Sequence, residues 1–259
     1  MSPAAHVTTP DTLSDATIES YRQNGFVHIP GIISPEEAEQ FRQAALDLVP
    51  RKKSLAQGSH AAIFTQLVNM WQVDNTIKQL TLHPNVGAVA ERLAGMPLRL
   101  WHDHILIKQP HNNAATEFHQ DQPYWPHANC RHALSAWIAL VDVPVERGCM
   151  TFLPGSQHRT DLRAQNLADE HDLMRLCPEF VWYPRVTIPL KAGDCTFHHA
   201  RTAHMATPNM TGDPRVAHVV IFMDADTTYT GSRHVVTDPL ELEAGGVFDH
   251  ELFPRVAHP

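Results

Sequence analysis

Apolar residues recur at helical spacing in the first third of the chain. Ala38, Phe41, Ala45 and Leu48 lie three or four positions apart, directly after Ser34-Pro35-Glu36-Glu37. Serine as the cap, proline at the first position and acids in the first turn are typical of a helix start. The pattern therefore predicts a helix from 35 to 48. Similar spacing predicts helices at 12–25, with Ser14 as its cap and Gly25 at its end, and at 64–71, 75–82 and 85–93.

After Gly95 the pattern changes to short apolar runs separated by turn residues. We expect strands at 98–108, 133–143, 149–153, 186–190, 194–199 and 215–223, besides a short one at 26–29. Alternation in the first of these places Leu100, His102, His104, Leu106 and Lys108 on one face. Many short strands suggest a sandwich, barrel or jelly roll, with the helices covering one face.

The organisation along the chain predicts one domain over residues 1–259, since neither an internal repeat nor a linker divides it. Residues 1–13 are small, polar and proline-bearing, and we expect a mobile arm there. Residues 157–183 read as a long polar insertion, and 224–259 as a loop-rich tail.

Composition restricts the partners and the compartment. There are 20 Lys and Arg against 28 Asp and Glu, and the net charge of -8 argues against nucleic-acid binding. No apolar run approaches the roughly 20 residues of a membrane helix, so we expect no membrane partner. The first residues lack the basic and apolar regions of a signal peptide. Four scattered cysteines are typical of reduced thiols in a cytoplasmic protein.

The first candidate for chemistry is the pair His119 and Asp121. On a strand, side chains two positions apart share a face, so an imidazole and a carboxylate there can hold one metal ion. A distant histidine would complete a two-histidine, one-carboxylate triad, which leaves positions open on iron(II). His198, His199 and His204 all compete for that third place, and adjacent His198 and His199 would point to opposite strand faces.

Arg215 opens the apolar run from 216 to 223, eleven residues after His204. Because burying an unpaired charge is costly, an arginine there needs a partner. A planar guanidinium suits a bidentate carboxylate, although a structural ion pair would also satisfy it.

In these motifs the chain resembles the phytanoyl-CoA dioxygenase-like branch of the iron(II)/2-oxoglutarate oxygenases. The matching order runs from about residue 18 to 224. Its pieces are Phe26 to Gly31, Lys108 to Pro110, His119 to Asp121, Trp137 to Leu140, Gly148 to Ser156, and His204 with Arg215. The resemblance implies a mainly β fold with flanking helices, a double-stranded β-helix of the jelly-roll, cupin-like type.

The resemblance also implies residue roles. Its spacing selects His204 as the third iron(II) ligand, and Arg215 as the contact for 2-oxoglutarate. Further cosubstrate contacts are expected from Trp137, Thr116 and Lys108. Family members often carry a small hydroxyl two positions after the distal histidine, where this chain has Ala206. The substrate pocket is expected to include His102, His104, Trp71, Tyr124 and Trp125.

The expected activity is oxidation of an unactivated C–H bond in a small-molecule metabolite, with O2 consumed and succinate and CO2 released. Hydroxylation is the first expectation, because Asp121 fills the place that a halide occupies in related halogenases. Desaturation, epimerisation and ring closure are alternatives. The acidic balance argues mildly against a coenzyme A thioester substrate. We expect a monomer or a homodimer.

Two alternative functions, from other classes of protein, remain possible on the sequence. One is a zinc or manganese hydrolase or isomerase on a cupin-like barrel, and the other is a non-catalytic metal-binding module. Neither needs a clamp for a dicarboxylate, so Arg215 argues against both.

Overall fold

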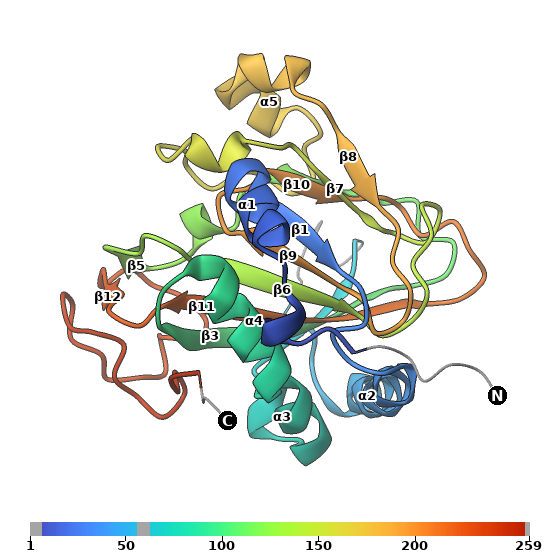
Figure 1. The fold of residues 1–259 in the computed structure, drawn as a ribbon, viewed down its shortest axis with the longest axis horizontal. Helices are drawn as coiled ribbons and strands as arrows, with labels where there is room; N and C mark the ends of the chain where they lie inside the picture. Colours follow the sequence, from blue (N-terminus) through green and yellow to red (C-terminus); the bar gives the residue numbers. More distant parts are fainter. Residues whose placement is uncertain (1–6, 56–62, 257–259) are drawn as a thin grey trace.

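The fold is built from two β-sheets with helices on the outside, as the computed structural model shows (Figure 1). The structure describes residues 7–55 and 63–256. The larger sheet has six strands in the order β1-β9-β6-β11-β3-β2, and the smaller has four in the order β4-β10-β7-β8. This is the expected mainly β, jelly-roll type of fold, and it confirms the predicted fold class.

The six-stranded sheet consists of β1 (Phe26–Ile29), β9 (Cys195–His199), β6 (Leu134–Ala139), β11 (Arg215–Asp224), β3 (Leu98–Lys108) and β2 (Thr65–Val68). The four-stranded sheet consists of β4 (Thr116–His119), β10 (His204–Ala206), β7 (Met150–Phe152) and β8 (Val186–Ile188). A small pair, β5 (His127–Ala128) with β12 (Thr228–Tyr229), stands apart from both. Each of these strands pairs with its neighbours in antiparallel orientation.

Four helices cover the outer face of the six-stranded sheet. They are α1 (Asp15–Asn24), α2 (Pro35–Leu48), α3 (Asn75–Thr81) and α4 (Pro84–Ala94). The sequence signals at their ends are confirmed: Ser14 and Ser34 accept the capping hydrogen bonds, and Gly25 ends α1 at φ 80°. Their buried residues share one hydrophobic cluster with the outer side chains of β3, β6, β9 and β11.

The predicted insertion, residues 157–183, carries its own short helix α5 (Asp172–Leu176). Figure 1 shows α5 and β8 at the top of the view, far from α2 and α3 at the bottom. Leu173, Cys177 and Phe180 are buried against Phe118 and Leu153, next to β4 and β7. The segment therefore covers the smaller sheet with an apolar side, and its outer surface exposes Val181 and Trp182 besides polar residues.

Two local predictions were wrong. Residues 64–71 do not form a helix, because Thr65–Val68 pairs with β3 as strand β2. Leu100 does not share the face of His102, because a bulge shifts the β3–β11 register between Ile221 and Phe222. Leu100 instead packs in the cluster beneath the helices.

The predicted mobile arm is also corrected in its described part. The backbone N–H of Thr8 donates to Gly31, and Leu13 is buried in the helix-side cluster. Residues 1–6 lie outside the described part of the chain.

The inner faces of the two sheets enclose a cavity of about 470 Å³. It is lined from one side by β2, β3, β6, β9 and β11, and from the other by β4, β7 and β10.

Candidate metal centre and cavity

The two halves of the predicted metal site meet at the edge of the smaller sheet. His119 is the last residue of β4, and His204, the first of β10, lies opposite it in the strand register. Asp121 is not on the strand as expected. It lies in the turn that follows, with αR backbone angles, and still points at His119.

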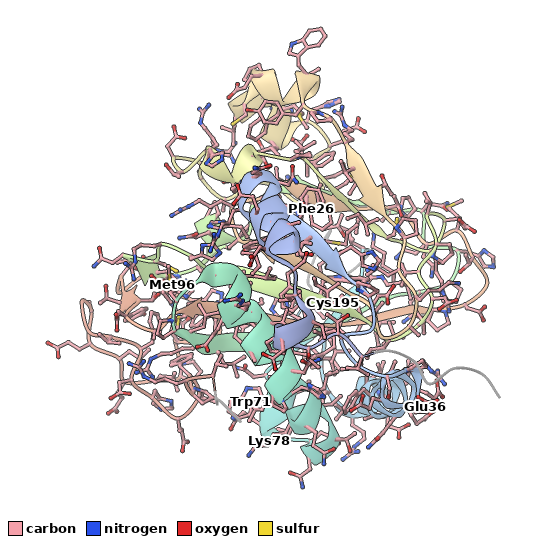
Figure 2. All side chains as sticks on the ribbon, viewed as in Figure 1. Phe26, Glu36, Trp71, Lys78, Met96 and Cys195 are labelled. Carbon is pink, nitrogen blue, oxygen red and sulfur yellow. The ribbon has the colours of Figure 1, made fainter. Side chains whose placement is uncertain are left out.

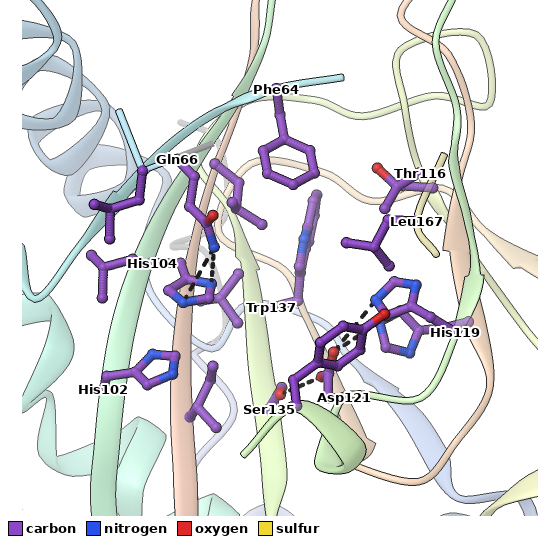
Figure 3. A pocket seen from close by; sticks show the side chains of 18 of the residues that line it. Phe64, Gln66, His102, His104, Thr116, His119, Asp121, Ser135, Trp137 and Leu167 are labelled. Atoms are coloured by element: carbon purple, nitrogen blue, oxygen red, sulfur yellow. Dashed lines mark hydrogen bonds and ion pairs between the residues drawn. The ribbon is translucent and has the colours of Figure 1, made fainter. Parts of the chain in front are cut away.

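The three side chains converge on one point. Asp121 Oδ1 lies 3.5 Å from His119 Nε2 and 3.7 Å from His204 Nε2. One ligand atom from each residue falls within 4.8 Å of the other two. Figure 3 shows His119 and Asp121 facing each other at one end of the cavity. Two imidazole nitrogens and a carboxylate oxygen are the donor set of a facial triad.

Backbone carbonyls fix the tautomer of both histidines. His119 Nδ1 is 2.7 Å from the Glu117 carbonyl oxygen, and His204 Nδ1 is 2.9 Å from that of Thr202. Each Nδ1–H therefore donates to the backbone, and the lone pair of each Nε2 is left for a metal ion. Burial lowers the pKa of His204 to about 3, so this imidazole is neutral, as a ligand must be.

The second oxygen of Asp121 is held by two further side chains. Ser135 Oγ donates to Oδ2 at 3.2 Å, and His198 Nε2 lies 3.5 Å from the same oxygen. Burial raises the pKa of Asp121, but the neighbouring His204, His119 and His198 outweigh it and hold the pKa well below its usual range. His198 thus contacts the carboxylate, while His204 completes the group.

His199 points away from this group, as adjacent strand positions require. It is buried rather than exposed, and its ring packs edge-on against His132 at 4.8 Å between centroids.

Arg215 lies in the cavity wall as the expected anion contact. Its side chain is 2% exposed, and its guanidinium carbon lies 5.2 Å from the ring centre of Trp137. Nη1 donates to the Leu106 carbonyl, and Nε is buried without a hydrogen-bond partner. Burial lowers its pKa to about 9, so the group is still cationic at neutral pH.

No acidic side chain among residues 7–55 and 63–256 forms an ion pair with Arg215. A buried cation without a protein counter-ion, in the same cavity as the triad, fits a carboxylate ligand. Thr116 and Trp137 also line this cavity. Ala206 lines it with a methyl group, so the usual hydroxyl contact at that position is missing.

Lys108 was placed wrongly among the cavity residues. It lies opposite Arg215 in the β3–β11 register, but it does not line the cavity. Its ammonium donates to three backbone carbonyls, those of Ala114, Ala206 and Thr207, at 2.9–3.2 Å. All three N–H groups are therefore used in holding the loops around β10.

Trp71 was also placed wrongly. It does not line the cavity and belongs to the cluster beneath the helices. Figure 2 shows Trp71 beside Lys78 of α3, and the Lys78 ammonium lies 5.8 Å from the centre of its ring. The expectation came from the family resemblance, and in this chain Trp71 packs beneath the helices instead.

The remaining predicted pocket residues, His102, His104, Tyr124 and Trp125, do line the cavity. Tyr124 donates from its hydroxyl to the Gln165 carbonyl. The polar residues that the sequence analysis missed are Ser135, Gln66 and His234. Gln66 was hidden by the wrong helix, since a strand would have placed it on the face of Phe64 and Val68. His234 comes from the loop-rich tail, where no periodicity gave a signal.

Comparisons with known proteins agree with this site. A family model described as phytanoyl-CoA dioxygenase (PhyH) matches residues 21–217. L-proline trans-4-hydroxylase of Streptomyces griseoviridis is 29% identical over 152 residues, which is 56% of each chain. The chain thus matches little more than half the length of that relative.

Two solved structures match over almost their full length. The non-heme alpha ketoglutarate dependent carbocyclase SnoK from nogalamycin biosynthesis is 38% identical at a TM-score of 0.89, covering 97% of this chain and 100% of that one. The corresponding epimerase SnoN is 36% identical at a TM-score of 0.83, with 94% and 98% covered. SnoN is also solved with Fe3+, alpha ketoglutarate and nogalamycin RO, and that structure matches at a TM-score of 0.82.

Proposed function

Because the chain belongs to the phytanoyl-CoA dioxygenase (PhyH) family of non-heme iron, 2-oxoglutarate-dependent oxygenases, we propose that it oxidises an unactivated C–H bond of a small-molecule metabolite. Iron(II) would be the metal cofactor. 2-Oxoglutarate and O2 would be consumed, and succinate and CO2 would be released. The observation that carries this proposal is the triad of His119, Asp121 and His204 in one cavity with the unpaired cation Arg215.

Each group of cavity residues has its own proposed role. His119, Asp121 and His204 would hold iron(II), which supplies the activation of O2 when bound. Arg215 would bind the far carboxylate of 2-oxoglutarate, with Trp137 packed against it and Thr116 beside it. Ser135 and His198 hold the second oxygen of Asp121, so that Oδ1 is presented to the metal. Apolar lining residues, among them Met150, Val219 and Ile221, would exclude water from the reacting groups.

Hydroxylation is the first proposed outcome, since Asp121 completes the triad and leaves no place for a halide. Ring closure or epimerisation is the second, and a specific observation supports it. The structures at 38% and 36% identity are those of a carbocyclase and an epimerase, and both match over more than nine tenths of this chain.

A substrate screen tests the proposal. The iron-loaded protein is incubated with 2-oxoglutarate and O2 carrying an oxygen isotope, and both succinate formation and product mass are measured. We expect substrate-dependent succinate that is lost in His204→Ala and kept in His158→Ala, an exposed histidine. Hydroxylation adds labelled oxygen to the product, ring closure removes two hydrogens, and epimerisation leaves the mass unchanged.

The proposal fails if the protein binds iron and 2-oxoglutarate but a broad substrate panel never stimulates succinate formation. That result would instead favour a non-catalytic metal-binding module. Turnover that needs zinc or manganese and no 2-oxoglutarate would favour a cupin-like hydrolase or isomerase.

A further inference from the structure

Away from the triad, the cavity has a wall of imidazole rings that the proposed reaction does not use. We call His102, His104, His234 and Gln66 the histidine wall. His102 and His104 project from the inner face of β3, Gln66 comes from the adjacent β2, and His234 comes from the segment after β12. Figure 3 shows His102 and His104 one above the other, on the opposite side of Trp137 from His119.

The rings of the histidine wall form a stack. His102 and His104 lie 4.4 Å apart between centroids at an interplanar angle of 20°. His102 and His234 lie 6.0 Å apart at 17°. The edge of Trp125 faces His102 at 86°. Parallel rings beside an open space provide a surface that a further flat ring system can extend.

Hydrogen-bonding capacity in the wall is unused. His102 is 1% exposed, and its Nδ1 has no partner within the described residues. Gln66 Nε2 lies 3.3 Å from one ring nitrogen of His104 and 3.5 Å from the other, so it can satisfy only one of them. Buried polar atoms normally have a partner, so the unpaired Nδ1 of His102 leaves this ring with an unused hydrogen-bonding atom next to the cavity.

The wall is also uncharged. Burial lowers the pKa of His104 and of His234 to about 4, and holds that of His102 well below its usual value. Asp121 and Arg215 are the charged residues among those that the structure shows lining the cavity, and both have roles at the metal and cosubstrate. Among the described lining residues, the phosphates of a coenzyme A thioester or the ammonium of an amino acid would find no counter-charge besides these two.

We propose that the histidine wall binds the hydroxyl or carbonyl oxygens of an uncharged, planar substrate. This inference rests on the proposed function, because it names the substrate class of the same cavity. A neutral imidazole offers one donor and one acceptor, which suits a phenol or a ketone. The cavity of about 470 Å³ lies in the range of small-molecule sites, and the metal and 2-oxoglutarate would share it with the substrate.

The test uses 1,8-dihydroxyanthraquinone as a probe and butyryl-coenzyme A as its charged comparator. Binding to the protein loaded with iron(II) and 2-oxoglutarate is followed without O2, through quenching of tryptophan fluorescence. We expect the probe to bind and the thioester to bind much more weakly. His102→Phe and His104→Phe keep a flat ring but remove the nitrogens, and each should raise the dissociation constant for the probe about ten-fold.

Two controls separate the possible failures. His158→Phe changes an exposed histidine and should bind the probe like the wild type. The visible absorption band of the iron(II)–2-oxoglutarate complex is recorded for every variant, and we expect it to be unchanged. If a histidine variant loses that band, the probe's dissociation constant is measured for Gln66→Leu instead, because this variant removes only an amide at the edge of the wall. A raised dissociation constant would then support the inference.

The inference is overturned if the wild type binds the thioester as tightly as the probe, or if it does not bind the probe. It is also overturned if the variants with an intact band bind the probe like the wild type. Absence of the band in the wild type would instead refute the proposed function, while the probe affinities would still report on the wall.

Discussion

At the scale of single residues, the site depends on what holds each functional group from behind. Both triad histidines donate Nδ1–H to a carbonyl two residues earlier, and Asp121 Oδ2 accepts from Ser135. Lys108 and Arg215 show the same principle in opposite ways. The Lys108 ammonium donates hydrogen bonds to three carbonyls, whereas the buried Arg215 has an Nε without a hydrogen-bond partner. The sequence shows the residue types but not which cation is already satisfied.

Removing the Arg215 guanidinium should weaken 2-oxoglutarate binding far more than iron binding. Truncating one partner of a buried charge pair costs about 2–5 kcal/mol, or roughly 30-fold to several thousand-fold in affinity. Anaerobic titrations of Arg215→Ala with each ligand measure the two effects. Arg215→Lys should be intermediate, since it keeps the charge and loses the fork. Arg131→Ala, an exposed arginine paired with Asp224, is the control. Unchanged 2-oxoglutarate affinity in Arg215→Ala would contradict the proposal that Arg215 binds 2-oxoglutarate.

Asp121 should also decide the type of product. A carboxylate in this position occupies the place that a halide needs, so the wild type should give the same product mass in chloride and in bromide. Mass spectrometry of the product from any accepted substrate measures this. Asp121→Gly should lose the oxidation, because an open position does not by itself place the substrate. A halogenated product from the wild type would contradict the role of the carboxylate.

At the scale of elements, strand register brings together residues that are far apart in the chain. The pairing of His204 with His119 brings the three predicted ligands together, and the pairing of β11 with β3 places Arg215 in the cavity wall. Most strands and four helices could be predicted, because alternation and capping residues are local signals. Strand β2 was missed because residues 64–71 read as helical, and only pairing with β3 makes them extended. The β3 bulge and the short β10 carry no periodic signal at all.

The end of α1 is linked to the metal site through Gly25. A Cβ on Gly25 would lie 2.3 Å from Thr202 Oγ1, and φ is +80°. The Thr202 carbonyl holds His204 Nδ1, so displacement of Thr202 should move a ligand. We expect Gly25→Ala to lower both the stability in urea and the iron(II) affinity.

Gly95→Ala is the matched control for this effect. Gly95 also ends a helix in the left-handed region, but its nearest atom is the flexible Arg22 Nη2 at 3.5 Å. It should lose only the roughly 1–2 kcal/mol of left-handed strain and keep its iron affinity. Equal iron affinity in Gly25→Ala and Gly95→Ala would contradict the link between α1 and the site.

At the scale of the whole molecule, two sheets enclose a cavity with the metal ligands on one side and the histidine wall on the other. The part of the chain that the structure describes has no helix that is both long and apolar enough to cross a membrane. Burial of so many imidazoles has a consequence for stability. The pKa values of His104 and His132 are lowered to about 4, and those of His127 and His218 to about 3, in each case mainly by burial.

The metal-free protein should therefore lose stability as the pH falls from about 6.5 to about 4. In that window the unfolded chain binds protons that the folded histidines do not, so each group contributes a slope of about 1.4 kcal/mol per pH unit. Burial raises the pKa of Asp103 to about 6, so in this window the folded chain binds a proton at Asp103 that the unfolded chain does not. This offsets the loss of stability from one of the histidines. Urea unfolding at about pH 7.5 and about pH 5 measures the difference. Equal or greater stability at the lower pH would contradict the buried neutral state.

We propose that His119, Asp121 and His204 hold iron(II) beside a 2-oxoglutarate site. An anaerobic titration of the iron(II)-loaded protein with 2-oxoglutarate, followed by visible absorption, tests this most directly. We predict one iron per chain and a weak charge-transfer band in the wild type and in His158→Ala, and neither in His204→Ala. A band that survives in His204→Ala but disappears in His198→Ala would contradict the assignment of the triad.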